Sequence, residues 1–254
     1  MTRILTYNVH RCVGVDRRLD VGRIADVVAA LEPDIVALQE LDVGRARTGG
    51  VDQAHEIARR LEMAFHFHPA MSVEEELYGD AILTRLPERL VRADALPPYP
   101  IRGLEPRGAL WIEVDLGEDR LQVINTHLGL VPQEQRRQAR ALAGRDWVGD
   151  HRRVGPTVLL GDFNAVAGSA VHRILTADLA DARRVAPARA PTPTFPSTFP
   201  LVQIDHVFVS PEVEVRALFA PYTQATRKAS DHLPLVMDFE VSHQGPADAA
   251  AAAS

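Results

Sequence analysis

Short apolar runs that end in a polar motif most constrain how this chain folds. Four runs of strand-like composition end in this way, at residues 4–9, 35–38, 121–125 and 157–160. Apolar side chains recur at helical spacing over residues 21–31, 53–61 and 132–148. This order of strand, helix, many strands, helix and strands predicts an α/β fold in which sheet packs on sheet and helices lie outside.

The rest of the chain is expected to be rich in strands. Further strands are predicted at residues 64–68, 81–84, 90–95, 109–115, 204–209, 213–218 and 233–239. Ser169 is placed to cap a short helix. Residues 186–200, rich in Pro, Ala and Thr, are expected to form a long irregular loop, and residues 243–254 a disordered tail.

Composition excludes some classes of protein. The formal net charge is −6, which argues against a protein that coats nucleic acid through a global positive field. It does not exclude a nuclease, because a basic rim and bound cations could offset the charge. Cys12 is the single cysteine, so no intrachain disulfide forms. We find no signal-peptide pattern and no apolar run long enough to span a bilayer, and we expect a soluble cytoplasmic protein.

Two motifs in the first part of the chain carry oxygen-bearing side chains. Asn8 lies near the end of the first run, where it is either a turn residue that bonds its own backbone or part of a site. Glu40 comes two residues after the apolar run at 35–38. A buried carboxylate is costly unless it meets a cation, a hydrogen-bond network or a cleft. Mg²⁺ prefers oxygen ligands, which suits Glu40, and the alternative is an exposed glutamate.

The sharpest local signal is Gly-Asp-Phe-Asn after the run at 157–160. Gly161 lets the backbone turn as the strand ends. Asp162 and Asn164 are two residues apart, so in an extended chain they face the same way. A carboxylate acceptor and an amide donor on one face suit a water nucleophile and a phosphoryl oxygen. The competing interpretation is an Asx-type turn.

Three further motifs bring histidine beside strands. His127 follows the run at 121–125 and is either a structural histidine or a group that shuttles protons or contacts a phosphate. Asp231 and His232 precede the last strand, where the carboxylate could orient a histidine or bind metal. Asp205 enters another apolar strand, either to hold a histidine in the correct tautomer or as a solvated strand start.

Together these motifs resemble one family. The ordered set Thr-Tyr-Asn-Val-His, Leu-Gln-Glu, Tyr-Gly-Asp-Ala-Ile-Leu-Thr-Arg, Asn-Thr-His-Leu, Gly-Asp-Phe-Asn, Ile-Asp-His-Val-Phe-Val and Ser-Asp-His-Leu-Pro-Leu is similar to the endonuclease/exonuclease/phosphatase superfamily. The resemblance runs from residue 8 to 232 and implies one domain over residues 1–242. It implies a four-layer α/β sandwich with two mainly antiparallel sheets face to face and helices outside.

The resemblance also implies a reaction, which is hydrolysis of a phosphodiester with Mg²⁺ or Mn²⁺. Asn8 and Glu40 would lie in the metal site, with Asp231 as a further ligand. Asp162 would orient or deprotonate the attacking water. Asn164 would hold that water and a phosphate oxygen.

The remaining implied roles concern the phosphate. His232, held by Asp205, would stabilise the charge that develops on it, and His127 would contact it from the other side or assist the leaving group. Arg107 lies in a stretch that is similar to the family's phosphate-binding arginine, with a surface loop arginine as the alternative. Asp80 stands where many members carry Asn, and it could partner a histidine or bind a cation.

The substrate is less constrained than the reaction. A nuclease is our first expectation, and a phosphodiesterase or phosphatase acting on a phospholipid, an inositol phosphate or another small phosphoester is the alternative. A non-catalytic binding module is the remote one. The chain is expected to be a monomer. A basic cluster could rim the cleft or form the solvated face of a helix and the turn after it: Arg136, Arg137, Arg140, Arg145, Arg152 and Arg153.

Overall fold

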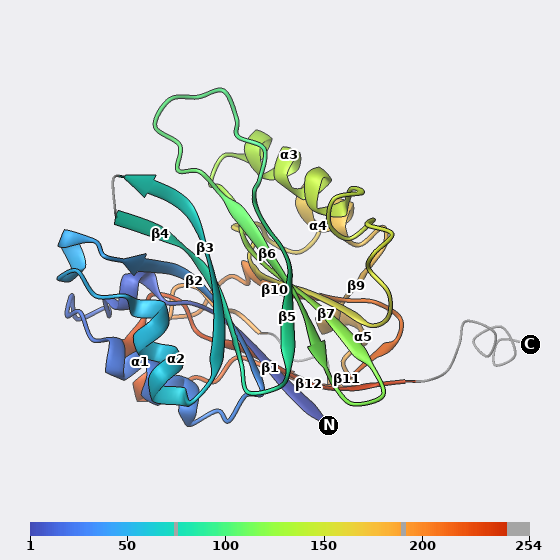
Figure 1. Ribbon diagram of the computed structural model, residues 1–254, viewed down its shortest axis with the longest axis horizontal. Coiled ribbons are helices and arrows are strands. Elements are labelled where there is room, and N and C mark those ends of the chain that lie inside the picture. Colours follow the sequence, from blue (N-terminus) through green and yellow to red (C-terminus); the bar gives the residue numbers. More distant parts are fainter. Residues whose placement is uncertain (74–75, 189–191, 243–254) are drawn as a thin grey trace, which may run out of the picture.

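Two six-stranded sheets lie face to face in the computed structural model, which describes residues 1–73, 76–188 and 192–242 (Figure 1). In spatial order the first sheet consists of β11 (Val213–Phe219), β12 (Leu235–Val241), β1 (Thr2–Asn8), β2 (Ile35–Val43), β4 (Glu76–Thr84) and β3 (Ala64–Val73). The second consists of β5 (Glu88–Ala95), β6 (Gly108–Asp115), β7 (Arg120–His127), β8 (Thr157–Asp162), β10 (Asp205–Val209) and β9 (Ala180–Asp181).

The two sheets share one pattern of pairing. Each holds a single parallel pair at its centre, β1 with β2 and β7 with β8, and its other neighbours are antiparallel. The register places Asn8 beside Gln39 and His127 beside Asp162. Strands that run in parallel end at the same edge of a sheet, so the pair of β7 with β8 delivers two strand-end side chains to one place.

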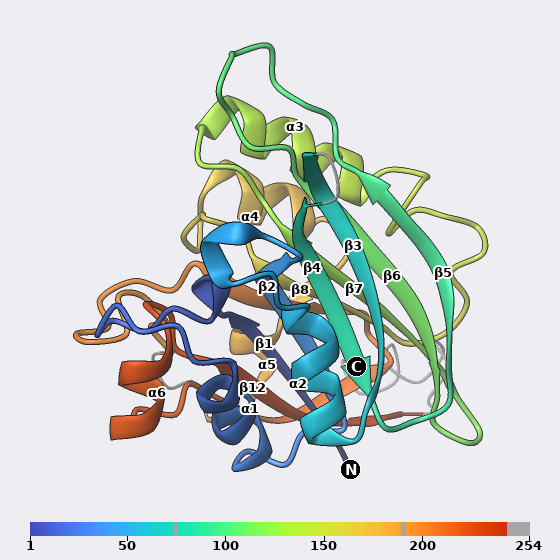
Figure 2. The ribbon, with the colours of Figure 1, turned by 60° about the vertical axis from the view of Figure 1, so that its left-hand side comes forward.

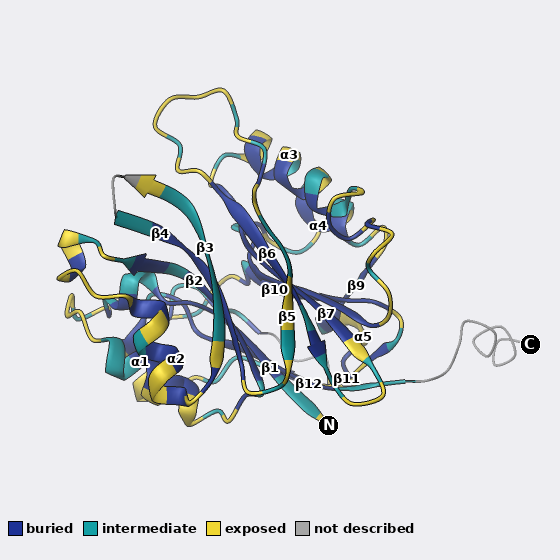
Figure 3. Ribbon diagram, in the orientation of Figure 1, coloured by how far each residue is buried: buried dark blue, intermediate teal, exposed yellow. Residues whose placement is uncertain are grey.

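Helices cover the outer faces, and three apolar cores separate the layers. One core lies between the sheets, one between the first sheet and its helices, and one between the second sheet and its helices. Figure 2 shows α1 and α2 lying together, and Figure 3 shows that the strands are mostly buried. The helices are α1 (Val21–Ala29), α2 (Gln53–Leu61), α3 (Pro132–Ala143), α4 (Ala170–Leu175), α5 (Ala182–Val185) and α6 (Gln224–Ala229), with 3₁₀ turns η1 (His10–Cys12) and η2 (Ala46–Thr48).

Helix α2 illustrates how local sequence forms these elements. The side chain of Asp52 accepts a hydrogen bond from the backbone N–H of His55, which caps the first turn. Ala54, Ile57 and Leu61 then recur at helical spacing on the buried face. The helix therefore begins at a cap and is held by one apolar stripe.

The expected four-layer α/β sandwich is confirmed. The predicted helix over 132–148 is wrong at its end, because α3 ends at Ala143 and Gly144 takes an extended conformation. The described part of the 186–200 loop is irregular apart from a bridge between Phe195 and Val202. The predicted tail at 243–254 lies outside the described residues. No helix in the described ranges is long and apolar enough to cross a membrane.

Candidate active site

The two parallel strand pairs bring the predicted site residues to one edge of the sandwich. Asn8 ends β1, His127 ends β7 and Asp162 ends β8. The side-chain amide of Asn8 donates to Asp162 Oδ2 at 3.0 Å and to Glu40 Oε1 at 3.1 Å. The bond to Asp162 joins the first sheet to the second. A cleft of about 460 Å³ opens there, lined by His10, Arg11, Glu40, Arg47, Tyr78, Glu105, Arg107, His127, Leu130, Asp162, Asn164, Phe195, Ile204, Asp231 and His232.

Asp162 is the most enclosed carboxylate in this cleft. Besides the bond from Asn8, its Oδ1 accepts the backbone N–H of Asn164 at 2.9 Å. Burial raises the pKa of Asp162, and the nearby charge of Asp205 adds to that rise, while His232 and the two hydrogen bonds oppose it. The carboxylate is thus fixed in orientation and more basic than a solvated aspartate.

His232 and Asp205 form a buried pair. His232 Nδ1 lies 2.9 Å from Asp205 Oδ2, which leaves Nε2 facing Asp162 Oδ2 at 3.7 Å. Burial alone would lower the pKa of His232, but Asp205, Asp162 and Asp231 together raise it to about 10. The ring of Phe195 packs against it, with 5.0 Å between the centroids. His232 is therefore an imidazolium at neutral pH, with its free N–H directed toward Asp162.

The end of β8 and the turn after it each contain a residue with an unusual backbone conformation. Gly161 has φ +144°, and a Cβ there would lie 1.9 Å from the carbonyl oxygen of Thr126 on β7, so only glycine fits. Asn164 adopts a left-handed conformation with φ +48°. Its side-chain amide donates to the carbonyl of Leu128 at 3.0 Å and lies 3.1 Å from His127 Nε2. The Asx-type turn and the site were alternative interpretations of this motif. The structure contains the Asx-type bond between Asn164 N–H and Asp162, and it also places the Asn164 side chain in the cleft.

Arg107 is buried, in contrast to a surface loop arginine. It is 7% exposed, and its Nη1 lies 2.9 Å from His127 Nδ1. Its Nη2 lies 3.2 Å from Glu105 Oε2. Burial lowers the pKa of His127 well below its usual value, and the positive charges of Arg107 and His232 lower it further. The pKa of His127 is thus lowered, while that of His232 is raised.

Glu40 enters the cleft through an irregularity in β2. Its backbone is left-handed with φ +62°, at a bulge between Leu38 and Leu41 in the pairing with β4. A non-glycine residue in this region costs about 1–3 kcal/mol, and such strain is concentrated at functional positions. The bulge turns Glu40 out of the sheet, where it lines the cleft.

The acidic side of the cleft suits a divalent cation. Asp80 is buried in β4, and burial raises its pKa to about 7. The charges of Glu40 and Asp162 raise it further, and Arg107 with the backbone N–H of Glu40 opposes them. Carboxylates that repel one another in this way are stabilised by a bound cation, and oxygen ligands are those that Mg²⁺ and Mn²⁺ prefer.

Other arrangements of the acidic residues are less suited to metal. Asp162, Asp205 and His232 each offer one atom within 4.8 Å of the others. His232 already shares a proton with Asp205, however, and an imidazolium has no lone pair for a metal. Asp231 lines the cleft but is bonded to neither Asn8 nor Glu40 in the described structure. Its Oδ1 lies 3.3 Å from Ser230 Oγ.

Sequence reasoning missed a buried polar layer behind the site. Gln39 Nε2 donates to Asn125 Oδ1 at 2.8 Å, which links β2 to β7 across the sandwich. Asn125 in turn donates to the carbonyls of Leu38 and Ala81. These two polar residues stand beside Glu40 and His127 in otherwise apolar strands, and that position in the sequence was the available signal. Arg11 and Arg47, also unpredicted, line the cleft rim.

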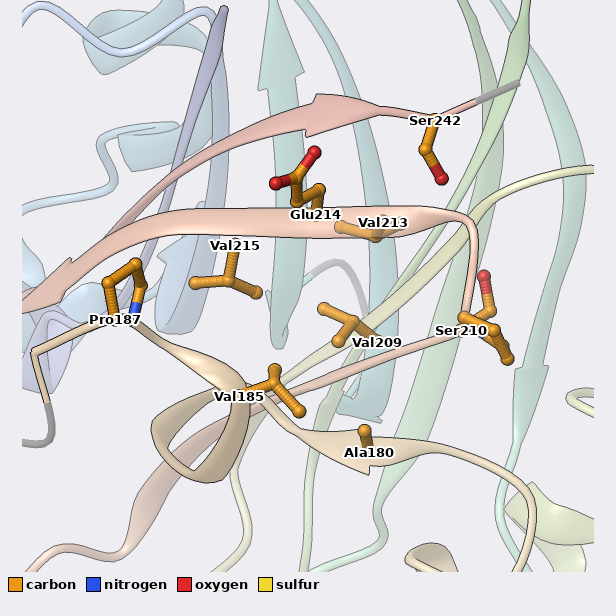
Figure 4. A pocket seen from close by; sticks show the side chains of 10 residues that line it. Ala180, Val185, Pro187, Val209, Ser210, Val213, Glu214, Val215 and Ser242 are labelled. Carbon is orange, nitrogen blue, oxygen red and sulfur yellow. The ribbon is translucent and has the colours of Figure 1, made fainter. Parts of the chain in front are cut away.

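A second cleft, larger than the first, lies far from these residues. It has a volume of about 580 Å³, and Figure 4 shows Val185, Val209 and Val213 around it. Glu214 is the one charged residue among its described lining residues. A hollow whose described lining is mainly valine and proline, with no positively charged side chain, offers no charge to hold a phosphate.

Comparison with known proteins agrees with the fold described here. YbhP, an uncharacterised protein of Escherichia coli, is 29% identical over 246 residues, 92% of this chain and 94% of YbhP. An endonuclease/exonuclease/phosphatase structure from Beutenbergia cavernae is 26% identical with a TM-score of 0.76, covering 95% of this chain and 72% of that one. The mannosyl-6-phosphatase Bt3783 of Bacteroides thetaiotaomicron shares the fold at 19% identity and a TM-score of 0.73, covering 94% and 100%.

The family assignment rests on nearly the whole length of the fold. The model of the endonuclease/exonuclease/phosphatase family matches residues 5–232, from β1 to the motif before β12. That range contains both parallel strand pairs and every polar residue that they bring to the cleft. The chain therefore belongs to the endonuclease/exonuclease/phosphatase family.

Proposed function

We propose that this chain is a divalent-metal-dependent phosphoester hydrolase in which water attacks phosphorus directly. The observation that carries the proposal is Asp162, a carboxylate with a raised pKa that is held from two sides and lines the cleft. Such a group can accept a proton from water as the water oxygen bonds to phosphorus and the ester oxygen leaves. The described lining residues include no serine, threonine or cysteine. Cys12 is buried, and burial raises the pKa of its thiol.

Positioned donors would neutralise the phosphate. The imidazolium of His232 presents an N–H on the side of Asp162, and Asp205 holds its ring. Asn164 and Arg107 line the same cleft. Donors fixed before the reaction stabilise developing charge without reorganising, and removing one such donor costs about 10²–10³-fold in rate.

Glu40 would hold the cation, with Asn8 beside it and Asp231 as a further ligand. A bound Mg²⁺ or Mn²⁺ would polarise a phosphoryl oxygen and stabilise the leaving oxygen. Asn8 also donates to Glu40 and Asp162, so it fixes the distance between the metal-binding and water-binding sides of the site.

The cleft favours a small phosphoester over the nucleic acid that we first expected. Its volume of about 460 Å³ falls within the range typical of small-molecule sites. None of the arginines of the predicted basic cluster lines it. Arg152 instead pairs with Asp150, and Arg153 bonds the carbonyl of Val148. Leu130, Phe195 and Ile204 supply an apolar wall. We propose a sugar, inositol or lipid headgroup phosphoester as the substrate.

A panel of substrates tests both parts of the proposal. The protein would be assayed with Mg²⁺ or Mn²⁺ on sugar phosphates, inositol phosphates, phospholipids, DNA and RNA. We expect hydrolysis of at least one small phosphoester that EDTA abolishes. Digestion of DNA or RNA alone would restore the nuclease prediction. Activity that survives EDTA would contradict the metal requirement, and retention of configuration at phosphorus would exclude direct attack.

Substitution of His232 tests the site itself. His232→Asn removes the imidazolium, and we expect kcat/KM to fall at least about 10²-fold. His151→Asn is the matched control, because its side chain is 93% exposed and lies outside the cleft. Equal activity of the two variants would show that the cleft is not the active site. We further propose that residues 1–242 form one domain that acts as a cytoplasmic monomer, which light scattering and fractionation can check.

A further inference from the structure

We propose that Arg107 holds His127 as a neutral imidazole with its proton on Nε2, so that His127 is an uncharged hydrogen-bond donor in the cleft and not an acid. Arg107 is then a positioning residue that acts through His127. The tautomer follows from contacts of the resting protein. Only its catalytic consequence rests on the proposed function.

The hydrogen bond between the two side chains determines the tautomer. Arg107 Nη1 lies 2.9 Å from His127 Nδ1, and both side chains are buried. A guanidinium has five N–H donors and no acceptor, and it does not lose its proton in proteins. The bond therefore forms only if Nδ1 offers its lone pair. A neutral ring that accepts at Nδ1 carries its proton on Nε2.

The other side of the ring also disfavours an imidazolium. Asn164 Nδ2 lies 3.1 Å from His127 Nε2, and its orientation is fixed because the same amide donates to the carbonyl of Leu128. Donors thus approach both ring nitrogens, and a neutral ring accepts from only one of them, which we assign to the charged and closer guanidinium. Nε2 then carries the proton and lies 3.5 Å from Asp162 Oδ2, a distance too long for a strong bond. That N–H remains available to a phosphate oxygen.

The charges around His127 agree with this assignment. Burial, Arg107 and His232 all lower its pKa, and Asp162 is the carboxylate that faces it directly. Behind the guanidinium stand three acidic groups that interact with Arg107 and not with the ring: Glu105, Asp80 and Glu134. The negative charge on this side therefore compensates the arginine, and His127 stays neutral.

In this arrangement His127 and His232 have different roles. His232 supplies positive charge, and His127 supplies a donor without charge while Arg107 supplies charge behind it. Because a neutral imidazole is a very weak acid, His127 does not protonate the leaving oxygen. It can only hydrogen-bond an oxygen of the phosphate or of the leaving group.

Nitrogen-detected NMR of histidine side chains tests the proposal on the full chain without substrate. We expect His127 to show a protonated Nε2 and an unprotonated Nδ1 from about pH 5 to 8, with and without inorganic phosphate. The exposed His151 serves as an internal reference for the chemical shifts. A His127 that gains a second proton within this pH range, or one with its proton on Nδ1, would overturn the proposal.

Two variants of Arg107 test the cause. Arg107→Met removes the charge and the donor, so His127 should gain a proton as the pH falls and the pH profile of kcat should acquire a new ionisation. Arg107→Lys keeps a charged donor and should restore the wild-type profile. A neutral Nε2-protonated His127 in Arg107→Met would show that Arg107 is not responsible. If Arg107→Met does not fold, the wild-type spectrum still decides the tautomer, and that spectrum does not depend on finding the natural substrate.

Discussion

At the scale of single residues, one side-chain type performs two tasks because its partners differ. His232 lies 2.9 Å from a carboxylate of Asp205, and His127 lies 2.9 Å from the guanidinium of Arg107. Both rings are buried, so burial alone would lower both pKa values. The partner therefore decides which ring is charged, and two histidines a few ångströms from the same Asp162 need not share a pKa.

Asp205→Asn should move the alkaline limit of activity to lower pH. In the wild-type protein the carboxylates keep His232 protonated up to a pKa of about 10. The stability that this ionisation contributes is fully present below about pH 6.5, the ordinary histidine pKa, and is lost as the pH rises through 10. Without the charge of Asp205, burial lowers the pKa of His232. We expect the alkaline limb of kcat/KM to shift down by at least about one pH unit.

The control for this variant is Asp146→Asn, whose side chain is 77% exposed. Both variants would be compared in pH–rate profiles and in urea titrations at about pH 6 and pH 9. A profile of Asp205→Asn that coincides with that of Asp146→Asn would contradict the role given to the Asp205–His232 pair.

The sequence predicts which residues belong to the site better than it predicts which of them contact one another. Asp162 and Asn164 stand out because glycine and an apolar strand precede them, and both lie in the cleft. The contact between Arg107 and His127 could not be predicted, because a buried arginine looks like a surface arginine in sequence. Its burial depends on packing between β6 and β7 and on acidic groups from distant elements.

At the scale of elements, the parallel pair of β7 with β8 depends on close approach at one residue. Gly161 pairs with Thr126 in the register of these strands, and its φ of +144° brings the two backbones together. The same pairing places His127 beside Asp162. The distance between these two site residues is therefore set by a glycine that contributes no side chain.

Gly161→Ala should destabilise the fold and reduce activity together. An alanine Cβ would lie 1.9 Å from the carbonyl oxygen of Thr126, so the strands must separate. We expect a loss of at least about 3 kcal/mol in the free energy of unfolding, measured in urea. Gly168→Ala is the matched control, with φ +78° and open space around the added carbon, and should cost about 1 kcal/mol. Equal losses would mean that close approach at Gly161 does not matter.

Elements with strong local signals were predictable, and those that depend on neighbours were not. Helix α2 has the bounds expected from its spacing, because an aspartate cap and a regular apolar stripe define it. Strand β9 was missed because its two residues, Ala180 and Asp181, pair only where β10 lies beside them. Helix α6 was missed because its capping box uses Thr223 and Thr226, which resemble loop residues in sequence.

At the scale of the whole molecule, acidity and metal binding are connected. The chain carries a net charge of −6, and part of that charge gathers where the two sheets meet. Folding brings Glu40, Asp80 and Asp162 from three strands close enough to repel one another, which costs electrostatic free energy. A cation that binds only the folded state recovers that free energy, so the stability of the whole fold should depend on metal concentration.

Mg²⁺ or Mn²⁺ should therefore raise the melting temperature through Glu40. At a concentration one hundred times the dissociation constant, binding adds about 2.7 kcal/mol, which corresponds to roughly 5–10 °C for a domain of this size. Glu40→Gln should remove this increase because it removes the carboxylate that lines the cleft. Glu214→Gln, in the second cleft, should retain it. Calorimetry of the wild type and the two variants, each with metal and with EDTA, measures this difference in melting temperature. If Glu40→Gln keeps the increase and Glu214→Gln loses it, the cation binds in the second cleft, and the prediction is wrong.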